Sequence, residues 1–86
     1  MLHLIAFDDP HGDLATACLA LYQDGDVCVF MDRGVLIAAE FPRRGPAYLL
    51  DGSEAPARCP ADLTVIDPDR LITLIAEHGP VTGWYP

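Results

Sequence analysis

Short apolar runs alternate along this chain with segments of helical periodicity, and Gly, Pro and Asp residues separate the two kinds of segment. Runs that are apolar throughout are typical of parallel strands covered on both faces. The four runs predicted to be strands are Leu2–Phe7, Val27–Met31, Ala47–Leu50 and Leu63–Ile66. Because such strands alternate with helical segments, the chain is predicted to be a small α/β domain.

The first helical segment follows the Asp-Asp-Pro sequence at 8–10. One stripe at helical spacing contains Leu14, Cys18, Leu21 and Tyr22. Gly25 supplies a stop signal after this stripe. We therefore expect a helix here whose stripe is apolar.

The second helical segment has the clearest start and stop signals in the chain. Asp67 is a good N-cap residue, and Pro68 suits the first helical position. The stripe that follows consists of Leu71, Leu74, Ile75 and His78, before Gly79 and Pro80. These signals predict a helix from 68 to 78.

Two further segments have weaker signals. The pattern at 35–40 fits a hairpin partner or a short helix, and its two alanines and one glutamate favour the helix. Val81–Tyr85 is predicted to add a short edge segment, with Trp84 packing the end of the chain.

The size of the chain bears on its assembly. We interpret its 86 residues as one domain, 1–86, and a domain of this size buries only roughly 60 to 65% of its unfolded surface. Hydrophobic residues make up 51% of the sequence, which is more than a lone small domain readily hides. We therefore expect an oligomer.

The charge excludes one class of partner. Thirteen acidic residues stand against five arginines and no lysine, which gives a formal charge of -8. A basic footprint for phosphate backbones is missing, so direct nucleic-acid binding is not expected. The apolar runs fall below the roughly 18 residues that span a bilayer, and the start of the chain lacks a basic leader. We expect a soluble, cytoplasmic protein.

Four stretches of the chain resemble the TusB/DsrH family, and they occur in the order in which the family has them. The stretches are MLHLI, DGDVCVFMDRGVLIAA, AYLLDGSEAPAR and VIDPDRLITLIAEHGPVTGW. The last is the most specific, since it joins a strand end, a capped helix, a histidine and a tryptophan near the end.

The resemblance implies a small three-layer α/β sandwich with a mostly parallel sheet, of the DsrE/DsrF/DsrH type. It implies partners as well: homologous TusC/TusD-like or DsrE/DsrF-like subunits, or further copies of this chain, and a persulfide-carrying protein. The complex would relay sulfur toward 2-thiolation of the tRNA wobble uridine, or serve the related relay of sulfur oxidation. The alternative is a non-catalytic assembly subunit with no thiol role.

This sequence departs from the family pattern in two places. The segment between Glu40 and Ala47 is shorter than in the family, and the usual Ala-Arg-Gly turn is present only as Ala57 and Arg58. TusB-type subunits generally have no cysteine of their own, whereas DsrH-type subunits have one in the first helix, where Cys18 lies. Cys18 therefore favours the DsrH side.

The cysteines differ in their suitability as sulfur carriers, which need an accessible thiolate. Cys18 is the first candidate, although its place on an apolar stripe equally fits a core cysteine. Cys28 lies inside a strand run and is expected to be buried. Cys59 is the second candidate, because Arg58 beside it in a polar loop would lower its pKa.

Other chemistry has little support. The cysteines and histidines show no zinc spacing, and His3 and His78 are interpreted as a packing residue and a helix C-terminal dipole partner. No catalytic or nucleotide-binding motif is present, so neither a metal nor a cofactor is predicted, and enzymatic activity would be at most that of a sulfurtransferase-complex subunit.

A rival hypothesis is a divalent-cation or phosphoacceptor site at the carboxyl edge of the sheet. The carboxylates expected there are Asp8, Asp9, Asp32, Asp51 and Asp67. Against it, the chain has no lysine to meet a phosphoryl group, and Asp9 and Asp67 are explained as helix caps.

Overall fold

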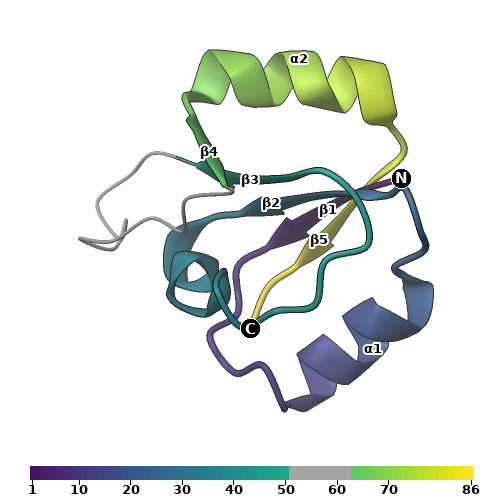
Figure 1. Cartoon of the computed structure of the whole chain (residues 1–86), viewed down its shortest axis with the longest axis vertical. Coiled ribbons are helices and arrows are strands. Elements are labelled where there is room, and N and C mark those ends of the chain that lie inside the picture. The colour runs from purple at the N-terminus through teal and green to yellow at the C-terminus, as the bar shows by residue number, and fades with distance from the viewer. Residues whose placement is uncertain (51–62) are drawn as a thin grey trace.

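The computed structural model describes residues 1–50 and 63–86. Within these ranges it has one parallel sheet of five strands in the order β4-β3-β2-β1-β5 (Figure 1). The strands are β1 (Leu2–Ile5), β2 (Val27–Phe30), β3 (Ala47–Leu50), β4 (Thr64–Ile66) and β5 (Val81–Trp84). The predicted α/β class is confirmed.

The strands form where the apolar runs predicted them: β3 has the predicted bounds, and β1, β2 and β4 are shorter than predicted. Strand β1 lies between β2 and β5, so that Leu4 is level with Val29 on one side and with Gly83 on the other. The predicted edge segment is therefore a full strand beside β1. Because every strand runs the same way, the carboxyl ends of all five meet at one edge of the sheet.

In the described part of the chain, three helical segments connect strands: α1 (Asp13–Leu21), α2 (Pro68–His78) and the 3-10 helix η1 (Asp32–Ile37). The helical alternative for 35–40 was right in kind, but η1 begins earlier and ends sooner. Gly34 allows η1 to lie close against β1, because a Cβ there would lie 1.9 Å from the Ile5 carbonyl oxygen. Neither α1 nor α2 is long and apolar enough to cross a membrane, and the same holds for η1.

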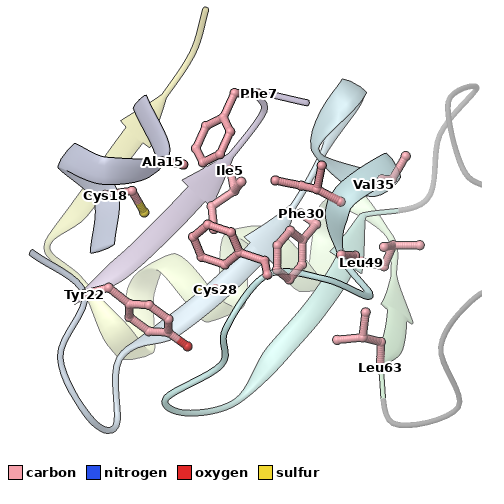
Figure 2. Packing of buried hydrophobic residues seen from close by; sticks show 13 residues of the cluster. Ile5, Phe7, Ala15, Cys18, Tyr22, Cys28, Phe30, Val35, Leu49 and Leu63 are labelled. Atoms are coloured by element: carbon pink, nitrogen blue, oxygen red, sulfur yellow. The ribbon is translucent and has the colours of Figure 1, made fainter. Parts of the chain in front are cut away.

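The two faces of the sheet are covered by different segments. Helices α1 and η1 cover the face of His3, Ile5, Cys28 and Phe30, and α2 covers the other. We refer to these as the α1 face and the α2 face. The α1 face has a larger buried cluster, shown in Figure 2, which consists of Ile5, Phe7, Ala15, Cys18, Tyr22, Cys28, Phe30, Val35, Ile37, Ala38, Phe41, Leu49 and Leu63. The α2 face buries Leu2, Val27, Val29, Ile66 and Leu74.

The predicted stripe of α1 is wrong at one residue. Leu21 is 53% exposed, whereas Tyr22 is buried. The backbone leaves the helix at Tyr22, whose ψ of 112° is extended, and this turns the Tyr22 ring into the core.

The predictions for α2 are confirmed. The Asp67 carboxylate accepts a hydrogen bond from the Arg70 N–H at 2.8 Å, and Pro68 is the first helical residue. Leu74 is completely buried, and His78 is the last residue of the helix. The cap and the stripe together fix how α2 lies on the sheet.

Candidate functional site

Cys18, the first candidate for sulfur transfer, lies on the inner side of α1. Its side chain is completely buried, and Figure 2 shows it on the side of the helix that faces the sheet. Burial raises the pKa of the Cys18 thiol to about 12, the nearby Cys28 adds to the rise, and Arg44 opposes it. At neutral pH this thiol is protonated and out of contact with solvent.

Cys28 lies on β2 on the same face and is also completely buried. Burial raises its pKa to about 11, while a hydrogen bond with the Tyr22 side chain opposes the rise. Burial likewise raises the pKa of the Tyr22 hydroxyl to about 12. The thiols and the phenol therefore form a neutral group beneath α1.

Arg44 contacts the Tyr22 side of this group of thiols and phenol. Its backbone N–H donates to the Tyr22 hydroxyl at 2.6 Å, and its guanidinium lies 5.4 Å from the centre of the Tyr22 ring. The guanidinium also donates to the carbonyl oxygens of Leu19, at 3.0 Å, and of Tyr22. These bonds hold the segment before β3 against the C-terminal end of α1.

The arrangement fits a core better than a carrier site, because persulfide exchange needs a thiolate that a partner can reach. Cys59, the second candidate, and Arg58 lie outside the described residues. The structure therefore brings Cys18 and Cys28 together, a pair that the sequence did not suggest.

On the α1 face, a buried histidine joins β1 to β5 and to the turn before β2. The Trp84 indole N–H of β5 donates to His3 Nδ1 at 3.1 Å, and His3 Nε2 lies 3.1 Å from an Asp26 carboxylate oxygen. Since the indole nitrogen only donates, Nδ1 is the acceptor, and Nε2 carries the proton that it donates to Asp26. His3 is thus a packing residue, as predicted, but one with two hydrogen bonds.

Asp26 is the charged end of this chain of bonds. The Gln23 backbone N–H, at 3.0 Å, and His3 hold the pKa of Asp26 down to about 2. The pairing orients the His3 ring, as a carboxylate does in many catalytic sites. However, Trp84 occupies the other ring nitrogen, so no acceptor is left for a substrate proton.

Among the carboxylates expected at the carboxyl edge of the sheet, Asp8, Asp9 and Asp67 each have a separate local partner. Asp8 accepts from Arg33 Nε at 2.7 Å, and Asp9 accepts from the His11 backbone N–H at 3.0 Å. The prediction that Asp9 caps α1 was wrong, because the turn places Gly12 at the N-cap position. Among residues 1–50 and 63–86, no group of three or more His, Cys, Asp or Glu residues could hold a metal ion. Asp51 lies outside the described residues.

A pocket of about 220 Å³ lies at the carboxyl end of β1, next to the start of α1. Its walls are Phe7, Asp8, Asp9, Gly12, Asp13, Leu14 and Pro86. The N-terminus of α1 favours anions, but the three carboxylates around it oppose them. Because only Asp8 is paired with an arginine within the described residues, the carboxylates outweigh the helix N-terminus, and the pocket disfavours anionic ligands.

The comparisons with known proteins leave the family open. No protein-family model matches the chain, and no curated protein matches it at a significant level.

Proposed function

We propose that this chain is an assembly subunit of a cytoplasmic sulfur-transfer complex, and that neither Cys18 nor Cys28 carries sulfur. The proposal of an assembly role rests on the burial of both thiols. Their pKa values of about 12 and 11 keep them protonated at neutral pH, and α1 separates them from any partner.

The sulfur pathway itself rests on the resemblance to the TusB/DsrH family. The parallel sheet with helices on both faces supports that resemblance, since a three-layer sandwich of the DsrE/DsrF/DsrH type is built in this way. The complex would serve 2-thiolation of the tRNA wobble uridine or the related relay of sulfur oxidation. Its other members would be TusC/TusD-like or DsrE/DsrF-like subunits and a persulfide-carrying protein.

The second candidate is a carrier role for Cys18 or Cys59. For Cys18 this requires α1 to lift from the sheet, which would break the bonds of Arg44 to Leu19 and Tyr22 and expose the aromatic core. For Cys59, the neighbouring Arg58 in the sequence would lower the pKa of the thiol, which favours the thiolate that a carrier needs.

Intact-mass measurement after incubation with a persulfidated donor protein tests the proposal. The native chain and the Cys18→Ser and Cys28→Ser variants are expected to show the same change in mass on incubation with the donor, because neither thiol takes up sulfur. A gain of one sulfur atom that disappears in Cys18→Ser would contradict the assembly role. A gain that disappears only in Cys59→Ser would make Cys59 the carrier.

A further inference from the structure

Strand β5 is an edge of the sheet and pairs with β1 alone within the described residues. The carbonyl oxygens of Pro80 and Trp84 accept from the N–H groups of Leu2, at 2.9 Å, and Ala6, at 3.1 Å. Alternate residues of a strand direct their backbone groups to the same side. The N–H and C=O groups of Val81 and Gly83 therefore point away from β1, at the outer edge.

Within β5 itself there is no charged side chain, bulge or proline, which are three of the devices by which proteins prevent pairing at an edge strand. Pro80 precedes the strand and faces β1, so its missing N–H removes no donor from the outer side. The run from Gly79 to Pro86 has no charged side chain. Strand β4 at the opposite edge is different, since it has three residues and is followed by Asp67 and Asp69.

We propose that β5 pairs antiparallel with β5 of a second copy of this chain, which joins the two sheets into one. Each copy has a formal charge of -8, so two copies repel each other over most of their surface. Strand β5 has no charged side chain, so pairing along it does not place like charges directly opposite each other. A pair of identical strands also satisfies its backbone groups reciprocally about a two-fold axis.

The backbone N–H and C=O groups that point away from β1 determine the register of this pairing. Gly83 lies opposite Gly83 of the second copy, and Val81 lies opposite Tyr85. Val81 is 37% exposed and Tyr85 is 51% exposed, so the pairing buries both in a β-branched and aromatic cross-strand pair. Gly83 suits the axis, because the Tyr85 ring already occupies the place of its missing side chain, 2.4 Å from a Cβ there.

Sedimentation over a series of protein concentrations tests the pairing. The native chain is expected to dimerise as concentration rises. The Val81→Asp variant would bring one added charge from each copy to the paired edge, so it should stay at the monomer mass of 9.3 kDa. Val65→Asp is the matched control, since Val65 is 49% exposed on the other edge strand, and it should dimerise normally. A native chain that is monomeric throughout, or dimerisation lost in Val65→Asp but retained in Val81→Asp, would overturn the proposal.

Amide hydrogen exchange of the unsubstituted chain supplies a second readout that needs no variant. The amides of Val81 and Gly83 should exchange more slowly as concentration rises, while that of Thr82, which faces β1, should not change. Association that leaves the Val81 and Gly83 amides unprotected would contradict pairing through β5. Neither measurement depends on sulfur transfer, so the dimer and the proposed function can fail separately.

Discussion

The two faces of the sheet are built differently. Among the described residues, the cluster on the α1 face has thirteen buried members and that on the α2 face has five. On the α1 face, the ring of Phe41 packs against Phe7 and Phe30, each at 5.9 Å between ring centres, and against Tyr22 at 6.4 Å. On the α2 face, Leu4, Tyr48, Leu50, Leu71 and Ile75 are only half-buried.

The comparison indicates which face contributes more to the stability of the isolated chain. The α1 face buries more side chains, although Leu14, Leu19, Ala47 and Trp84 are only partly buried there. The side chains of His3 and Tyr22 also have hydrogen-bond partners on this face. The α2 face depends on one amphipathic helix that leaves apolar side chains partly in water. Changes on the α1 face should therefore cost more free energy of unfolding than equivalent changes on the α2 face.

The largest effect is expected from Phe41→Ala on the α1 face. Phe41 is 3% exposed and contacts three aromatic rings, so its removal leaves a cavity that the neighbours cannot fill. The free energy of unfolding should fall by about 3 to 5 kcal/mol. Urea denaturation measures this value.

Leu74→Ala is the equivalent change on the α2 face. Leu74 is completely buried, but half-buried neighbours and α2 itself can move to close the space. We expect a loss of about 2 to 3 kcal/mol, at the lower end of the range for buried leucines. A loss larger than that of Phe41→Ala, by the same denaturation experiment, would reverse the comparison of the faces.

Acid should weaken the α1 face through Asp26. The folded pKa of about 2 lies below the ordinary value of an aspartate, so the ionised carboxylate stabilises the fold above about pH 4. This contribution is lost as pH falls from about 4 through 2. In Asp26→Asn, unfolding measured from pH 5 to pH 2 should depend less steeply on pH. An unchanged slope would mean that the carboxylate does not stabilise the His3 network.

The smallest effect is expected at the N-terminus of α2. Asp67→Ala removes the hydrogen bond from the Arg70 N–H and should cost about 1 kcal/mol. Asp69→Ala is the control, because Asp69 lies in the same first turn and should lose only a few tenths of a kcal/mol. Equal melting temperatures for the two variants would show that the Asp67 cap does not contribute to stability.

Local patterns were sufficient to predict most elements. The strand runs and the capped helix at 68–78 lie where the sequence placed them, because apolar spacing and caps act within a few residues. Leu21 and Tyr22 show the limit of this approach. Periodicity treats both as core residues, but only the backbone after α1 decides which one turns inward.

Contacts between distant residues could not be predicted. His3 and Trp84 are 81 positions apart, and His3 and Asp26 are 23 apart, so no local pattern joins them. The order of the strands is equally non-local, since α2 carries the chain across the sheet to place β5 beside β1. The burial of Cys18 was one of two predicted alternatives, and the packing of α1 selected it.

Alkylation of the native protein tests the central claim, that the α1 face seals Cys18 and Cys28. In a Cys59→Ser background, iodoacetamide is added to native and to urea-unfolded protein, and intact mass records the modified thiols over time. The native protein should remain unmodified while the unfolded chain reacts at both cysteines. Modification of Cys18 in the native protein at a rate near that of the unfolded chain would contradict the claim and restore Cys18 as a sulfur carrier.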